Sequence, residues 1–278
     1  MSVPASSPHG PHDARPIHVG TMGWSYADWL GPFYPPGITS RQFLGHYARV
    51  FDCVEIDSTF YGTPPEASVR SWARAVPPGF RFCPKVPRSI THDARLTHVD
   101  ADLCAFVERM LLLEDRLGPI LIQMPPGFTR TDLPALQAFL PLLRPFRAQQ
   151  VRFAIEFRHP SLLCPEVTAL LQEEEIARVA ADYAGMPRRF ALTAPFAYVR
   201  LIGRHGAFEH HRHLQSDQTL RLQQWCRALQ DHRARYQEAF VFCNNDYEGY
   251  SPATCNRLRS LLGLPVVERV PEAQGTLF

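Results

Sequence analysis

Residues 151–183 read VRFAIEFRHPSLLCPEVTALLQEEEIARVAADY and alternate between β-rich and helical segments. A β-rich run, Arg152–Phe157, is followed by a stretch of helical period, Leu162–Glu175, and then by a second β-rich run, Arg178–Asp182. A helix between two short strands is typical of parallel pairing, because a parallel connection has to cross over the sheet. The stretch therefore predicts one strand–helix–strand unit of a parallel sheet.

The same alternation repeats along the chain. Helical stretches lie between most of the eight β-rich runs, which are Ile17–Gly20, Cys53–Asp57, Arg81–Val86, Pro119–Gln123, Arg152–Phe157, Arg178–Asp182, Ala197–Ile202 and Phe240–Asn244. Eight strand–helix repeats in about 250 residues match a closed (β/α)8 TIM barrel of the α/β class, whereas an open Rossmann sheet usually has six strands and a glycine fingerprint, which this sequence lacks. We expect a single barrel domain at residues 17–263, a disordered leader at residues 1–16 and a tail at residues 264–278.

Composition narrows the partners and the location. Lys and Arg number 29 against 27 Asp and Glu, and this net charge of +2 excludes a polybasic nucleic-acid binder, so any anion site must be local. The longest apolar runs are far shorter than the roughly 20 residues that span a bilayer. The first sixteen residues lack the basic start and apolar core of a secretory signal. We therefore expect a cytoplasmic protein with no membrane partner.

Polar residues gather where the β-rich runs end, and the active site of a barrel lies at the carboxyl ends of its strands. The candidate catalytic residues are Glu55, Lys85, Glu156 and Asp182. The candidate substrate-binding residues are Trp24, Tyr26, Tyr61, His92, Gln123, Arg158, Arg200, Asn244, Asn245 and Asp246. A charge buried alone would cost several kcal/mol, so we expect these groups to share one hydrated pocket. The alternative is a layer of ion pairs that merely closes the barrel mouth.

Several long motifs carry a resemblance to a known family. They are GTMGWSYADWLGPFYPPG, VEIDSTFYGTP, GFRFCPKVPRSITH, LIQMPPGF, FAIEFRHPS, YVRLIG and FCNNDYEGYSPATCN, and they run in order over residues 17–263. This set resembles the DUF72 family (YecE-like proteins), which implies a TIM-barrel fold and no established activity. Family members usually have Asn where this chain has Asp57, so we assign that carboxylate no catalytic role.

Three kinds of chemistry fit these residues. Lys85, Arg158 and Arg200 come from three different strand ends and would hold a phosphate or carboxylate group. Glu55 and Glu156 come from non-adjacent strands and could supply the carboxylate pair of a glycoside hydrolase. Mg or Mn would suit the oxygen ligands Glu55, Glu156, Asp182 and Asp246, whereas no organic cofactor motif occurs. The cations favour an anionic substrate over a neutral sugar.

The C-terminus carries a separate signal. The last five residues, QGTLF, resemble the QxxLF peptide by which bacterial DNA-processing proteins dock on the replicative sliding clamp. In that interpretation Leu277 and Phe278 enter an apolar groove while Gln274 fixes the register, and Gly275 weakens docking because Leu is commoner there. The alternative is that Leu277 and Phe278 fold back on the base of the barrel.

These observations give one leading hypothesis and two alternatives. The leading hypothesis is an enzyme, a hydrolase or phosphoesterase, that acts on an anionic small molecule or on nucleic acid, with Glu55 or Glu156 as general acid or base. The first alternative is a non-catalytic binding module for nucleic acid or the sliding clamp. The second is a sugar-active hydrolase or isomerase.

Overall fold

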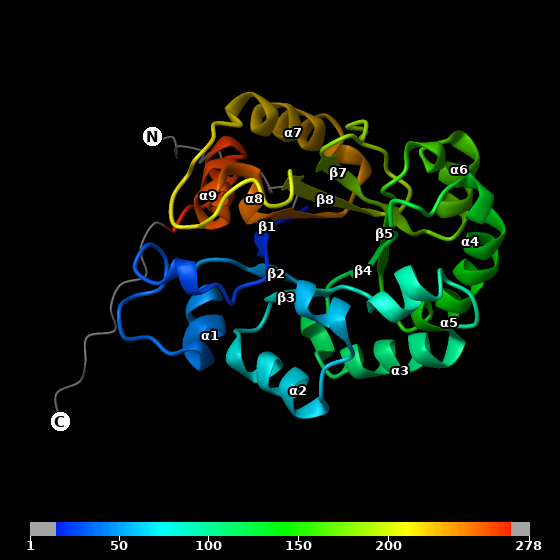
Figure 1. The fold of residues 1–278 in the computed structure, drawn as a ribbon, viewed down its shortest axis with the longest axis horizontal. Helices are drawn as coiled ribbons and strands as arrows, with labels where there is room; N and C mark the ends of the chain where they lie inside the picture. The colour runs from blue at the N-terminus through cyan, green and yellow to red at the C-terminus, as the bar shows by residue number, and fades with distance from the viewer. Residues whose placement is uncertain (1–14, 268–278) are drawn as a thin grey trace, which may run out of the picture.

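The computed structural model describes residues 15–267, in which parallel strands are surrounded by helices (Figure 1). The strands are β1 (Ile17–Met22), β2 (Cys53–Ile56), β3 (Arg81–Pro84), β4 (Ile120–Gln123), β5 (Phe153–Glu156), β6 (Ala177–Arg178), β7 (Ala180–Tyr183), β8 (Phe196–Gly203) and β9 (Glu238–Cys243). The helices are α1 (Phe43–Tyr47), α2 (Glu66–Ala75), α3 (Asp100–Leu111), α4 (Leu133–Phe139), α5 (Arg144–Arg147), α6 (Pro165–Glu173), α7 (Thr219–Asp231), α8 (Asn245–Glu248) and α9 (Ser251–Leu261). Most of the predicted leader and tail lies outside the described residues.

Two parallel sheets make up the wall of the barrel. Their strand orders are β3-β2-β1-β9-β8-β7 and β4-β5-β6. The sheets meet on one side through the chain itself, because β6 and β7 are parts of one strand that is interrupted at Val179. On the other side, isolated parallel bridges join Phe82 to Leu117 and Lys85 to Leu121. With β6 and β7 counted as one strand, the eight predicted runs are all found as parallel strands, in the order of a (β/α)8 barrel whose two sheets are not joined into one closed sheet.

The structure differs from the predicted segments in places where local geometry is decisive. Helical period in the sequence predicts a helix over Asp100–Leu117, but α3 ends at Leu111, and soon afterwards Glu114 has a φ of 55°, a left-handed value that a helix does not continue through. Helices α5 and α8 were not predicted, because four residues are too few to show a period. No helix occurs between β7 and β8, in agreement with the sequence.

Side chains alternate between the inside of the barrel and the outer layer under the helices. The inner core includes Cys53, Cys83, Leu121, Ala154 and Tyr198. Two positions further along the chain, the side chain points to the same side, and at these positions stand Glu55, Lys85, Gln123, Glu156 and Arg200. The alternation therefore places five polar groups in one layer above an apolar interior.

Candidate functional site

A buried arginine links two buried glutamates at the carboxyl end of the barrel. The Nη2 and Nε atoms of Arg200 donate to Glu55 at 2.6 and 3.0 Å, and its Nη1 donates to Glu156 at 2.5 Å. The hydroxyl of Tyr198 also donates to Glu55, at 2.7 Å. Both glutamates are 0% exposed. Their charges are therefore balanced by protein groups and not by water.

Arg158 reaches the same glutamate pair from the loop after β5. Its Nε donates to Glu156, and its Nη2 lies 3.4 Å from Oε1 of Gln123. The guanidinium also packs over the ring of Tyr183, with 3.9 Å between Cζ and the ring centroid. Glu156 thus has two cationic partners, Arg158 and Arg200.

Lys85 completes the cluster from the side of β3. Its ammonium lies 3.9 Å from Oδ1 of Asp57 and 4.0 Å from the centroid of the Phe60 ring. The same oxygen of Asp57 lies 3.7 Å from Nη2 of Arg200, and it is buried without a hydrogen-bond donor among residues 15–267. No described residue accepts a hydrogen bond from the Lys85 ammonium either. The two charges therefore face each other across a gap too wide for a direct hydrogen bond.

The two glutamates differ in pKa although they share Arg200. Burial raises the pKa of Glu55 to about 7, and the lowering effect of Arg200 is partly offset by the nearby charge of Asp57. Burial also acts to raise the pKa of Glu156, but Arg200 and Arg158 outweigh it, so this pKa is lowered from its ordinary value. At neutral pH the cluster therefore holds one carboxyl that can give up a proton and one that stays ionised.

Burial also shifts the pKa values of Lys85 and of its neighbour His92. Burial lowers the pKa of Lys85, against the opposing effect of Asp57. His92 lies edge-on to Phe60, with ring centroids 4.9 Å apart, and its pKa is lowered by burial and by Lys85. The cluster as a whole contains three acids and three bases, namely Glu55, Asp57, Glu156, Lys85, Arg158 and Arg200. When Glu55 takes up a proton, the cluster gains one unit of positive charge.

The predicted aromatic contacts divide into packed and open side chains. Trp24 packs edge-on against Trp72, with ring centroids 5.6 Å apart. Tyr26 donates its hydroxyl to the backbone oxygen of Met22 at 2.5 Å. Both are therefore occupied within the protein. Tyr61 is 86% exposed, so it is free to contact a substrate at the rim.

The structure does not bring Asp182 to the cluster. Its neighbours Ala181 and Tyr183 pack against the inner core, so Asp182 points to the outer layer. There its Oδ2 accepts hydrogen bonds from Trp225 Nε1 at 3.1 Å and from the Tyr247 hydroxyl at 3.0 Å. This placement corrects the expectation that Asp182 shares a pocket with Glu55, because Asp182 ends its strand on the opposite face.

The residues after β9 mainly build α8. Asn244 caps this helix by accepting a hydrogen bond from the backbone of Asp246 at 2.9 Å, while its Nδ2 lies 3.5 Å from Sδ of Met22. Asn245 is buried and accepts from the backbone and the hydroxyl of Ser251 at 3.0 and 2.8 Å. The Asp246 carboxylate accepts from a backbone N–H of the loop after β8. Only Asn244 reaches the edge of the cluster, so the predicted substrate contacts of Asn245 and Asp246 do not converge with the others.

The predicted Mg or Mn ligands do not form one site. Residues 15–267 contain no group of three or more His, Cys, Asp or Glu side chains that could hold a metal ion. Arg200 already occupies Glu55 and Glu156, and Asp182 lies on the other face of the wall. The donor set therefore does not fit a divalent cation.

The cluster contains members that were not among the predicted site residues. Tyr198, Tyr183 and Asp57 all contact it. The signal that could have found the tyrosines is the two-residue spacing, since Tyr198 lies two residues before Arg200 and Tyr183 lies two residues after an inward-facing alanine.

Two further expectations concern partners. Gln274, Leu277 and Phe278, the predicted clamp-binding residues, lie outside the described part of the chain. Within residues 15–267, each helix is too short or too polar to cross a membrane.

Comparison with known proteins gives one family throughout. A family model described as "Protein of unknown function DUF72" matches residues 18–275. The UPF0759 protein YecE of Escherichia coli K12 is 38% identical over 144 residues, which cover 52% of this chain and 49% of that protein. The UPF0759 protein YunF of Bacillus subtilis is 28% identical over 120 residues, which cover 40% and 41%. The chain thus spans about half the length of the curated relatives it matches.

Solved structures agree with the fold. A DUF72 family protein (TM1631) from Thermotoga maritima superposes with a TM-score of 0.76 and 29% identity, covering 89% of this chain and 99% of that one. A second DUF72 family protein (EF0366), from Enterococcus faecalis, has a TM-score of 0.73 at 23% identity, covering 91% and 100%. The second likeness concerns the fold alone.

Proposed function

We propose that this chain, which belongs to the DUF72 family of unknown function, is an enzyme. Its substrate in this proposal carries a phosphate group and binds at the carboxyl end of the barrel. In this proposal Glu55 is the general acid, Glu156 is the general base and Lys85 contacts the phosphate oxygens. Arg200 is a positioning residue, because both sides of its guanidinium are already held by glutamates.

The observation that carries the proposal is the gap between Lys85 and Asp57. The Lys85 side chain is 10% exposed, and no described residue accepts a hydrogen bond from its ammonium. Asp57 Oδ1, 3.9 Å away, has no donor. Buried polar groups are normally satisfied, so this pair calls for an oxygen-bearing group that accepts from the lysine and donates to the carboxylate. A protonated phosphate oxygen provides both functions.

The pKa difference between the glutamates supports acid–base chemistry. Burial raises the pKa of Glu55 to about 7, which is close to the optimum for proton transfer at neutral pH. The lowered pKa of Glu156 keeps a base available at the same pH. Two carboxyl groups with diverging pKa values are the usual basis for assigning one acid and one base.

The rim favours a substrate with a flat ring. Tyr61 is 86% exposed directly beyond β2, and an exposed aromatic side chain can stack on a nucleobase with a gain of about 1–3 kcal/mol. Arg158, which packs on Tyr183, adds a cation near the cluster. We therefore include nucleotides and nucleic acid among the phosphate-bearing substrates.

The experiment compares purified wild type with Glu55→Gln and Lys85→Met on phosphomonoesters, phosphodiesters, sugar phosphates and DNA with abasic sites, and on nitrophenyl glycosides. We expect turnover of a phosphate compound that decreases above about pH 7 and is lost by at least about a hundredfold in Glu55→Gln, the lower end of the usual range for one acid–base group. Glu66→Gln, on the exposed start of α2, is the matched control. Turnover of glycosides alone would favour the sugar-active alternative, and no turnover with no phosphate binding would refute the proposal.

A second candidate function rests on the QGTLF terminus. We propose that Gln274, Leu277 and Phe278 dock on a bacterial sliding clamp, either as a tether for the enzyme or as the main role of a non-catalytic module. Removal of residues 274–278 should abolish binding to immobilised clamp while unfolding transitions stay unchanged. Equal binding by the shortened chain would reject this candidate, and clamp binding without any catalysis would favour the module.

A further inference from the structure

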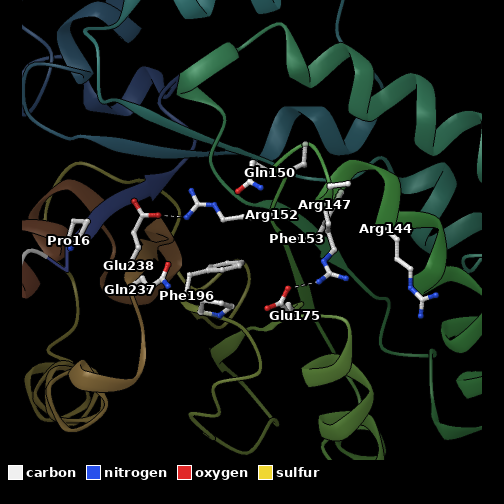
Figure 2. A pocket seen from close by; sticks show the side chains of 13 residues that line it. Pro16, Arg144, Arg147, Gln150, Arg152, Phe153, Glu175, Phe196, Gln237 and Glu238 are labelled. Atoms are coloured by element: carbon white, nitrogen blue, oxygen red, sulfur yellow. Dashed lines mark hydrogen bonds and ion pairs between the residues drawn. The ribbon is translucent and has the colours of Figure 1, made fainter.

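A cavity lies at the opposite end of the barrel from the charged cluster. It has a volume of about 640 Å³ and opens at the amino ends of β5, β8 and β9 (Figure 2). Phe153 lines it, whereas Glu156, three residues further along β5, belongs to the cluster. Three residues of strand separate the two places by roughly 10 Å. The cavity is therefore a different site from the one proposed above, and its size is that of pockets that bind small molecules.

Arg152 is the central polar group of this cavity. Its guanidinium carbon lies 5.4 Å from the ring of Phe196 and 5.2 Å from the ring of Phe240, and its Nη1 donates to Glu238. Its Nε and Nη2 have no hydrogen-bond acceptor in residues 15–267. Two rings and one carboxylate thus fix the orientation of the guanidinium while leaving donors for a ligand.

Glu238 is itself held from the other side. His18 bonds to Glu238 at 2.8 Å and to Asp52 at 2.6 Å. Burial acts to raise the pKa of Glu238, but His18 and Arg152 lower it to about 2, so this carboxylate stays ionised and does not release Arg152. The arginine is therefore prepared before any ligand arrives, which reduces the entropic cost of binding.

The opposite wall adds charge and polar groups. Arg147 donates to Glu175 at 2.7 Å, as Figure 2 shows, and to the buried Glu174 at 3.2 Å. The lining contains three arginines and two glutamates, but Arg144 and Arg147 also pair with the buried Glu174 behind it, so the arginines and glutamates balance. Gln150 and Gln237 contribute neutral amides. The open donors of Arg152 are therefore the feature that favours an anion over a cation.

We propose that this cavity binds a small molecule in which an anionic group is attached to a flat apolar ring. The anionic group contacts the open nitrogens of Arg152, and the ring lies against Phe196 and Phe153. Carboxylate and phosphate share the required chemistry, because both accept paired hydrogen bonds from a guanidinium.

The test titrates the full chain with benzoate, phenyl phosphate and inorganic phosphate, followed by calorimetry and by backbone amide shifts. We expect benzoate or phenyl phosphate to bind at millimolar concentration and to shift the amides of Arg152 and Phe196, and the stronger of the two identifies the anionic group. Inorganic phosphate, which lacks the ring, should bind at least tenfold more weakly at this site. Shifts confined to the cluster around Lys85, or no binding by either ring compound, would overturn the proposal.

Variants separate the cavity from the rest of the protein. Arg152→Met should weaken binding at least tenfold, since it removes the open donors. Ala148→Trp places a bulky side chain at an exposed position of the lining and should block binding while leaving every guanidinium in place. Arg70→Met, an exposed arginine on α2, is the matched control and should bind as wild type. Unchanged binding in Ala148→Trp would refute the site, even if Arg152→Met failed to fold.

Discussion

Replacement of Glu55 by Gln should change how stability depends on pH. The pKa of Glu55 is raised from its ordinary value of 4.5 to about 7, mainly by burial. An unfolded chain therefore loses this proton at lower pH than the folded chain does. A raised pKa contributes stability that is fully present below pH 4.5 and is lost as the pH rises through 7. One pKa unit corresponds to about 1.4 kcal/mol, so the contribution is about 3 kcal/mol.

The measurement is the free energy of unfolding of wild type and Glu55→Gln in urea, at closely spaced pH values from 4 to 8. Because Gln cannot titrate, the wild type should lose about 3 kcal/mol relative to the variant between pH 4.5 and 7, and the difference should then be constant. Glu66→Gln is the control, since Arg70 lowers the pKa of the exposed Glu66 and the difference must change in the opposite direction. A flat difference for Glu55, or a wild type that gains stability with pH relative to the variant, would refute the assigned environment.

Three further predictions concern the charged cluster and the buried His18. Arg200→Met leaves two buried carboxyl groups without their shared cation and should lower the free energy of unfolding by about 3–5 kcal/mol at pH 7; a loss below about 1 kcal/mol would contradict the buried ion pairs. Asp57→Asn replaces the carboxylate that accepts from the protonated phosphate oxygen beside Lys85 and should weaken inorganic phosphate binding about threefold or more by calorimetry, whereas tighter binding would show that this carboxylate repels the anion. For His18, burial opposes the charge but Asp52 and Glu238 raise the pKa from 6.5 to about 9, so its stabilisation is complete below pH 6.5 and should decline by about 3 kcal/mol as the pH rises through 9; a constant difference between wild type and His18→Gln over that range would exclude this charge.

The barrel could be predicted because its buried strands appear in the sequence as short apolar runs that alternate with helical stretches. Most of the β-rich runs are short, largely apolar and followed by a helical stretch, and the observed strands lie within a few residues of the predicted runs. The break at Val179 could not be predicted, because Val179 is itself a β-branched residue and lies within a predicted strand, Arg178–Asp182. Helix α8 could not be predicted either, because its four residues are too few to show a helical period.

The candidate site was predictable where the face of the strand was considered together with the position of the residue. Glu55, Glu156 and Arg200 meet because each lies two residues after an inward-facing side chain. Asp182 ends its strand just as visibly, but it is one residue out of phase and lies against Trp225. A position near the end of a strand does not show whether a side chain points into the barrel or away from it. The two-residue period of a strand does show this.

The ion pair between Arg200 and Glu156 joins the two sheets of the barrel wall. Arg200 belongs to β8 in the six-stranded sheet, and Glu156 belongs to β5 in the three-stranded sheet. On the side away from Val179, isolated bridges join the two sheets, and at the amino ends of the strands Arg152 and Glu238 also pair across them. The ion pair between Arg200 and Glu156 thus connects the two sheets. A proton or ligand that neutralises Glu156, or that displaces Arg200, also weakens the contact between the sheets.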